Sequence, residues 1–121
     1  MDDDDKLYRQ ISPKFFQDGT ISSQAFRPLG GKTKLSLYNG LMITPKDAYV
    51  HYTETLHNQS DGVAEILVGS FTKRGLEVIP DGEGFDEHVS ADFSNIIHSR
   101  KELEKVSRNL RDEAKMVFTK C

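Results

Sequence analysis

Two charged side chains lie in partly apolar segments, where burying a charge without a partner is energetically costly. Arg9 lies in the short, partly apolar stretch Leu7–Ile11, so its guanidinium must reach solvent or hold a carboxylate or a phosphate. Glu65 interrupts the apolar run VAEILV, and burial on both faces of a strand would force this carboxylate to pair, with Arg9 or Arg27 as natural partners. Two interpretations stay open: a ligand site with an active-site carboxylate, or an outward arginine and a structural ion pair.

The histidines give a weaker signal. His88 and Asp92 are four residues apart, so both could lie on one face of a strand as a base and its orienting carboxylate. The alternative for His88 is a surface position at the end of that strand. No HExxH or CxxC spacing occurs, and we expect no metal site. The GxSxG elbow, the Walker loop and the GxGxxG fingerprint are also absent, so the commonest hydrolase and nucleotide-binding motifs are missing.

The chain opens with an acidic segment. We interpret MDDDDK, residues 1–6, as the remnant of an expression tag, and we expect one domain over residues 7–121. Without the four aspartates and the lysine of that segment, the net charge of -3 rises to zero. A neutral chain has no general attraction for nucleic acid, so nucleic-acid binding is not expected and the expected partner is another protein.

Cysteine content and hydropathy bear on location. Cys121 is the only cysteine, so no internal disulfide can form and a reducing, cytoplasmic location is expected. No apolar run is long enough to span a bilayer, and no secretory leader follows the acidic segment. We therefore expect a protein without membrane association.

Several segments have the pattern of short strands. KLSLY, residues 34–38, alternates with its two leucines on one face and ends at the turn pair Asn39-Gly40. The run VAEILVGSF, residues 63–71, is the best candidate for a central strand. Further extended segments are expected at 7–11, 20–26, 76–79 and 88–93. The loop 27–33 contains two glycines and is a candidate ligand-contact surface.

Two helices are predicted to pack on this sheet. Thr44 and Asp47 form the start of the first, which we expect from about Pro45 to Leu56. A Ser99–Glu102 capping box begins the second, which we expect to run to Thr119. We expect its apolar side to face the core, and we expect a second buried cluster of Tyr8, Phe15, Phe16 and Phe26. The expected fold class is a single α+β domain with a small mixed or antiparallel sheet packed by two main helices, the longer one C-terminal.

Three stretches of the chain resemble a known family. LYRQISPKFFQDGTISSQAFRP, LSLYNG and TPKDAYVHY are similar to segments of a family of small bacterial proteins that begin with an LYRQI…SQAFRP pattern and end in a lysine- and arginine-rich helix. The resemblance spans most of the chain after MDDDDK. It implies no activity, because none is established for that family.

A second resemblance is to RES-domain toxins and other ADP-ribosyltransferase-like folds. Arg9, Arg27, Tyr38 and the two glycines of the 27–33 loop stand in a similar order, although the usual GGRWN run is absent. The resemblance implies that NAD is bound, with Arg9 and Arg27 on the pyrophosphate and Tyr38 stacked on the nicotinamide. It also implies that Glu65 stabilises the oxocarbenium charge at the ribose.

Two functions from different classes follow. The first is a non-enzymatic protein-interaction module of a small bacterial protein, linked to mobile elements and needing no cofactor. The alternative is an ADP-ribosyltransferase-like or NAD-hydrolysing enzyme of the toxin type, with NAD as its ligand.

Overall fold

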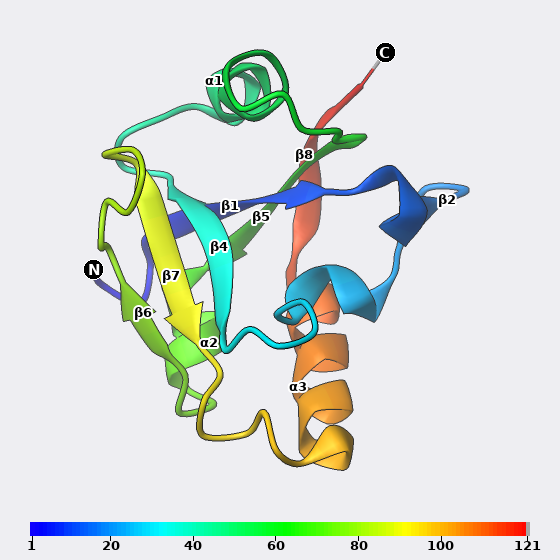
Figure 1. Ribbon diagram of the computed structural model, residues 1–121, viewed down its shortest axis with the longest axis vertical. Helices are drawn as coiled ribbons and strands as arrows, with labels where there is room; N and C mark the ends of the chain where they lie inside the picture. Colours follow the sequence, from blue (N-terminus) through cyan, green and yellow to red (C-terminus); the bar gives the residue numbers. More distant parts are fainter. Residues whose placement is uncertain (121) are drawn as a thin grey trace.

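The centre of the protein is an antiparallel sheet. Residues 1–120 are described by a computed structural model, in which six strands lie in the order β6-β7-β4-β1-β5-β8 (Figure 1). These strands are β1 (Lys6–Ile11), β4 (Lys34–Asn39), β5 (Gly62–Leu67), β6 (Glu77–Ile79), β7 (His88–Asp92) and β8 (Lys115–Thr119). A separate small sheet consists of β2 (Phe16–Gln17) and β3 (Thr20–Ile21).

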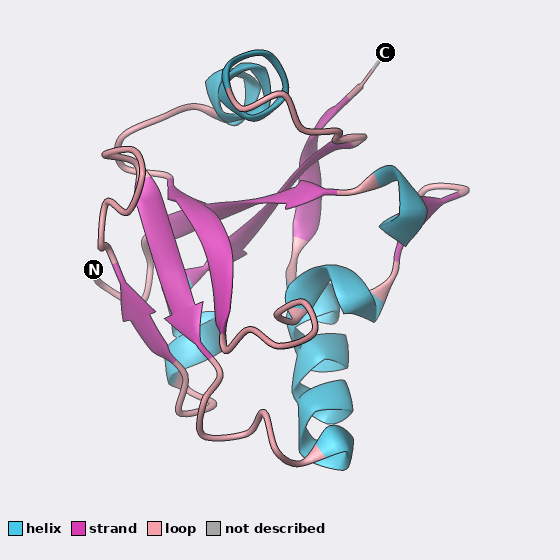
Figure 2. Ribbon diagram, viewed as in Figure 1, coloured by secondary structure: helices cyan, strands magenta, loops and turns pink. Residues whose placement is uncertain are grey.

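Helical segments surround the sheet (Figure 2). They are η1 (Pro13–Phe15), η2 (Ser23–Phe26), α1 (Pro45–Val50), the π-helical turn η3 (His51–Thr55), α2 (Val68–Thr72) and α3 (Arg100–Glu113). The predicted start of the first helix is confirmed, because the Thr44 hydroxyl accepts a hydrogen bond from the Asp47 amide. The Ser99 hydroxyl caps α3 in the same way. The fold class is α+β with the longest helix near the C-terminus, as the sequence predicts.

One face of the sheet carries the larger apolar core. Leu35 and Leu37 alternate along β4 onto this face, as predicted, and pack with Ile11 of β1. Helix α3 and the short η2 cover them, contributing Leu110 and Phe26, neither of which has exposed surface. Burial of these large side chains on one face therefore fixes the positions of β1 and β4.

The opposite face carries a smaller cluster beneath α1. Tyr8, Tyr38 and Val63 pack around Ala48 of that helix. The Gln10 side chain donates from Nε2 to the Ala48 carbonyl at 2.9 Å, which ties the helix to β1. Helix α1 therefore stands over one end of the sheet (Figure 1).

The pairing of β1 differs on its two sides. Its register with β5 is continuous from Lys6↔Leu67 to Ile11↔Gly62. With β4 it pairs only at Leu7↔Asn39 and Tyr8↔Tyr38. Beyond Tyr8 the two strands diverge, and β1 runs across the view of Figure 1 while β4 turns down beside β7.

Two predicted elements end earlier than expected. Helix α3 stops at Glu113, and Lys115–Thr119, predicted to be helical, is strand β8. The physical reason is the open edge of β5, which offers backbone hydrogen-bond partners to β8. The valine, phenylalanine and threonine of β8 also favour a strand. The predicted strand 63–71 likewise ends at Leu67, and α2 follows because Val68 and Phe71, three residues apart, both bury on one side of a helical turn.

Two smaller predictions near the N-terminus are wrong. The segment 20–26 is extended only at Thr20–Ile21, because Ser22 caps the helical turn η2 through a bond from the Gln24 amide. The expected aromatic cluster does not form as one unit, since Tyr8 lies on the face opposite Phe26. Side chains of neighbouring strand residues alternate between faces, and Tyr8 follows Leu7, which occupies the larger core.

The acidic N-terminal segment contacts the body of the protein. The carbonyls of Asp5 and Asp3 accept hydrogen bonds of 2.9 Å from the amides of Val68 and Gly69. These amides open helix α2 and have no partner within the helix. Strand β1 begins at Lys6, so the sheet includes the last residue of MDDDDK, the segment interpreted as the remnant of an expression tag.

Candidate active site

A cleft of about 740 Å³ opens where β1 diverges from β4. We call it the β1–β4 cleft. Strand residues contribute Arg9, Gln10, Ser36, Leu37, Tyr38, His88 and Ser90, and loops and η3 contribute Leu29, Gly31, Lys32, Thr33, Lys34, Tyr52, Leu56, Asn58, Glu83 and Phe85. The glycine-bearing loop that the sequence singles out thus borders this cleft.

A chain of hydrogen bonds joins three side chains at the cleft. The Ser36 Oγ lies 3.1 Å from His88 Nε2, and His88 Nδ1 lies 2.7 Å from Asp81 Oδ1. A carboxylate only accepts, so Nδ1 carries the ring proton and Nε2 accepts from the Ser36 hydroxyl. The Ser36–His88–Asp81 chain therefore supplies a hydroxyl, a base in contact with it, and a carboxylate that orients the base.

Local sequence explains why these groups meet. The alternation of β4 buries Leu35 and Leu37 and leaves Ser36 exposed on the other face. The β4–β7 register places Ser90 opposite Ser36 and His88 opposite Tyr38, so His88 is a diagonal neighbour of Ser36 on the same face. Asp81 comes from the turn between β6 and β7.

That turn holds the carboxylate against β7. Gly82 has a left-handed φ of +60° and donates its amide to the His88 carbonyl at 3.0 Å, which returns the chain to the strand. The Ser90 hydroxyl donates to Asp81 Oδ2 at 2.6 Å. Burial alone would raise the pKa of Asp81, but hydrogen bonds from Ser90, His88 and the Glu83 amide outweigh it and lower that pKa to about 2. Asp81 is therefore a fixed anion at neutral pH.

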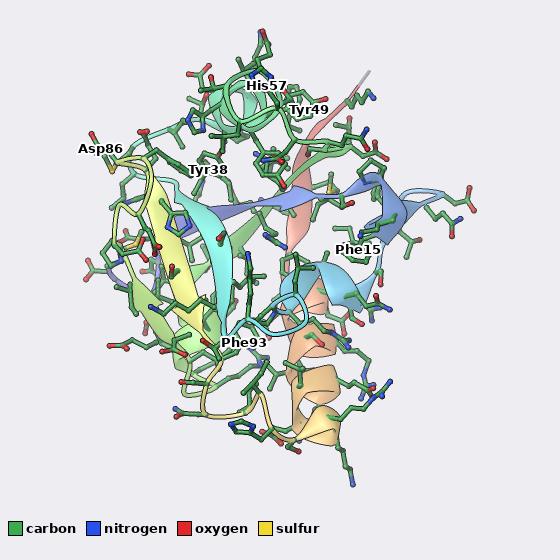
Figure 3. The ribbon with its side chains drawn as sticks, viewed as in Figure 1. Phe15, Tyr38, Tyr49, His57, Asp86 and Phe93 are labelled. Atoms are coloured by element: carbon green, nitrogen blue, oxygen red, sulfur yellow. The ribbon has the colours of Figure 1, made fainter. Side chains whose placement is uncertain are left out.

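Aromatic rings form one side of the cleft next to His88. The Phe85 ring centroid is 5.1 Å from that of Tyr38, 4.6 Å from that of His51 and 5.3 Å from that of His88. The Tyr38 hydroxyl lies 2.8 Å from His51 Nδ1, in the space between β4 and the α1 segment (Figure 3). Burial raises the pKa of Tyr38, so its phenol stays neutral. This side of the cleft suits a planar or apolar part of a ligand.

Arg9 stands where the two strands diverge. Its Nε donates to the Ala25 carbonyl at 2.8 Å and its Nη1 to the Ser36 carbonyl at 3.0 Å. Burial lowers the pKa of Arg9 to about 10, which still leaves it charged at neutral pH. The guanidinium thus replaces β1 as the hydrogen-bond partner of β4 and brings a positive charge close to Ser36.

The four residues predicted for a site do not share this cleft. Arg9 and Tyr38 line it, and Arg27 and Glu65 do not. Glu65 lies between two lysines instead, 3.6 Å from Lys6 Nζ and 3.5 Å from Lys115 Nζ. The partners of Glu65 in an ion pair are therefore lysines on the neighbouring strands, and not the arginines expected.

Arg27 lies on the side of the larger core, near η2. Its Nη2 donates to the Ser23 hydroxyl at 3.1 Å, and its Nε is buried without a partner. No described contact connects it with the cleft.

The histidine interpretation needs one correction. The carboxylate that orients His88 is Asp81, and the Asp92 carboxylate accepts instead from the Ser94 amide at 2.8 Å. Ser36 and Asp81 are site residues that the sequence interpretation missed. The available signals were the solvent-facing serine within KLSLY and the turn Pro80-Asp81-Gly82 directly before the β7 strand.

Because comparison with known proteins found no match, the function is inferred from the site. No protein-family model, no curated protein and no solved structure matches the chain. Within residues 1–120, no group of three or more histidine, cysteine, aspartate or glutamate side chains could hold a metal ion. No helix in this described part is long and apolar enough to cross a membrane.

Proposed function

We propose that this protein is a serine hydrolase that cleaves an ester or a related acyl bond in the β1–β4 cleft. The observation that carries the proposal is the Ser36–His88–Asp81 chain, with contacts of 3.1 and 2.7 Å, in a cleft large enough for a small molecule. Nucleophile, base and orienting group are the three roles that acyl transfer needs.

The reaction follows from the directions of the hydrogen bonds. Ser36 Oγ attacks the substrate carbonyl as its proton passes to His88 Nε2, and Asp81 stabilises the imidazolium that forms. His88 then gives this proton to the leaving alcohol as the bond to the alcohol oxygen breaks, which leaves an acyl group on Ser36. Water attacks that ester, His88 takes a proton from the water and returns it to Ser36 Oγ, and the acid is released.

The negative charge that develops on the substrate carbonyl oxygen during the attack needs a hydrogen-bond donor. The Ser36 carbonyl points to Arg9, and the amide and carbonyl of one strand residue point to the same side. Because β1 does not pair with β4 beyond Tyr8, the Ser36 amide faces the space where β1 has diverged. This N–H is the group that we assign to the carbonyl oxygen of the tetrahedral intermediate.

A labelling experiment tests the proposal directly. A fluorophosphonate probe should modify Ser36, as located by mass spectrometry of the digested protein. Ser36→Ala should remove the label and lower kcat/KM for 4-nitrophenyl acetate by about 100-fold or more, and His88→Ala should do the same. Ser12→Ala is the matched control, because Ser12 lies outside the cleft and its side chain caps nothing. Absence of labelling, or full activity of Ser36→Ala, contradicts the proposal.

An interaction role is the second candidate, and one observation favours it. Leu41 and Met42 follow β4 in adjacent positions and are 67% and 54% exposed. These two adjacent apolar side chains could contact an apolar surface of another protein. Leu41→Ser with Met42→Ser should abolish capture of a protein partner from the source cells while leaving fluorophosphonate labelling unchanged, and labelling lost together with capture would contradict this candidate.

A further inference from the structure

We propose that the substrate carries an anionic group, a carboxylate or a phosphate, which binds the Arg9 guanidinium beside the acyl bond. This inference rests on the proposed hydrolase function and names the class of its substrate: an acyl compound with an anion at a short distance from the reactive carbonyl.

The charge of Arg9 is not neutralised by the protein. Both of its hydrogen bonds go to backbone carbonyls, those of Ala25 and Ser36. Within residues 1–120, no carboxylate lies within ion-pair distance of it. A partly buried cation that lacks a carboxylate is costly, and an arriving anion would relieve that cost.

Donors remain available on the guanidinium. Among described side chains, the Nε of Arg27 is the buried polar atom that lacks a partner. The Nη2 of Arg9 has no hydrogen-bond partner among residues 1–120 and is not one of their buried unsatisfied atoms, so it is accessible, and Arg9 borders the cleft. The edge formed by Nη1 and Nη2 matches the two oxygens of a carboxylate or phosphate.

The surrounding charges favour an anion. Lys32 and Lys34 border the same cleft as Arg9, and Glu83 is the one carboxylate among the residues that line it. Cationic side chains in a cleft with low-dielectric walls raise the local concentration of anions. The Asp81 carboxylate is engaged by hydrogen bonds from His88, Ser90 and the Glu83 amide.

The position of Arg9 limits the length of the substrate. Its Nη1 lies 3.0 Å from the carbonyl oxygen of Ser36, the residue that attacks. Arg9 and Ser36 both line the cleft, so a short substrate can contact both. Leu29 and Leu56, 57% and 38% exposed, border the cleft with Phe85 and suit an apolar remainder. A short dicarboxylate or phosphorylated acid, esterified with an apolar alcohol, fits these requirements.

The first test compares esters with and without the anion. The wild type should hydrolyse the mono-4-nitrophenyl ester of succinate with a kcat/KM about tenfold or more above that for 4-nitrophenyl acetate, after correction for the uncatalysed rates. Arg9→Gln should remove this preference, and Arg9→Lys should keep part of it. Lys101→Gln, on the surface of α3 outside the cleft, should leave the preference unchanged. Hydrolysis without a preference overturns the inference and leaves the hydrolase proposal standing.

The second test needs no catalysis and no Arg9 variant. Succinate and phenyl phosphate are titrated separately into ¹⁵N-labelled Ser36→Ala protein, and the Arg9 Nε–H signal is followed by NMR. Saturable movement of that signal supports the anion site, and the tighter of the two ligands decides between carboxylate and phosphate. Binding without esterase activity in the wild type would contradict the hydrolase and retain the anion site. A signal unmoved by either ligand overturns the inference, even if Arg9→Gln fails to fold.

Discussion

The two sides of strand β1 differ in how fully they pair with the neighbouring strands. Along β5 it pairs at every residue from Lys6 to Ile11, and this side continues to the edge strand β8. Along β4 it pairs at two residues only, and beyond them lies the β1–β4 cleft. The first side is a closed part of the sheet, and the second is an opening within it.

The difference shows how a small sheet can hold a cleft while a side chain replaces part of the lost strand pairing. Separating two central strands would leave backbone groups without partners, which is costly when they are buried. Arg9 supplies a donor to the Ser36 carbonyl and a second donor to Ala25, so the opening is bridged by one side chain. The closed side should therefore govern stability, and the open side should govern chemistry.

The largest expected effect lies in the core that supports both sides. Leu110 of α3 has no exposed surface and packs in the larger cluster. Leu110→Asp would place a charge there and should cost about 4 kcal/mol or more, enough to unfold much of the population. Urea denaturation followed by circular dichroism measures this, and a variant that unfolds at the wild-type midpoint would show that α3 does not support the sheet.

An intermediate effect compares the carboxylate that orients His88 with one that lies away from the cleft. Asp81 and Glu113 both have a pKa of about 2 in the folded protein, Glu113 chiefly because Arg74 donates hydrogen bonds to it. A pKa below the unfolded value stabilises the fold above that unfolded value, and the contribution disappears as the pH falls from about 4 to about 2. Each shift corresponds to at most about 2–3 kcal/mol.

Asp81→Asn and Glu113→Gln should therefore each weaken the fold at pH 7 and reduce its loss of stability between pH 4 and 2. Only Asp81→Asn should also lower esterase activity, because Asp81 orients His88. Unfolding midpoints at pH 7, 4 and 2.5, with kcat/KM at pH 7, measure both properties. Equal activity of the two variants would contradict the role of Asp81 in orienting His88.

The smallest expected effect belongs to Glu65, on the closed side. Its ion pairs join β5 to Lys6 and Lys115, whose side chains are 56% and 72% exposed. Solvent screens such pairs, so Glu65→Gln should cost about 1 kcal/mol or less and leave ester hydrolysis unchanged. The same variant tests the NAD interpretation, since loss of NAD turnover with Glu65→Gln would support a catalytic carboxylate there.

Local patterns were sufficient to predict most elements of the fold. Thr44 and Ser99 marked the starts of α1 and α3 because capping depends on residues within one turn. Alternation in KLSLY predicted which face of β4 is buried. The strand at Lys115–Thr119 was not predictable in this way, because the apolar spacing continued the helical period and the deciding factor was the open edge of β5, distant in sequence.

The candidate site was predicted less well for the same reason. Arg9 and Tyr38 were identified as residues that line a site, and His88 as a base with a carboxylate. Sequence spacing predicts Asp92, which shares a strand with His88, whereas the observed partner Asp81 is brought to His88 by the turn between β6 and β7. Ser36 is 52 residues from His88, and only the register between β4 and β7 brings them together. No periodicity within either strand contains that information.

The strand order has a consequence for how the protein folds. The strand that ends in the middle of the sheet is the first to be synthesised, and its neighbours β4 and β5 follow only after loops that begin at Ile11 and Asn39. Such distant pairing must overcome the entropy of closing long loops, and sheets of this kind fold on the order of milliseconds to seconds. On the ribosome, β1 can meet β4 once residues 34–39 have emerged, but it lacks β5, with which it pairs at every residue, until more than half of the chain has emerged. During this interval Leu7 and Ile11 are apolar residues on a strand that lacks its longer partner, and such exposed apolar strands favour aggregation of a nascent chain.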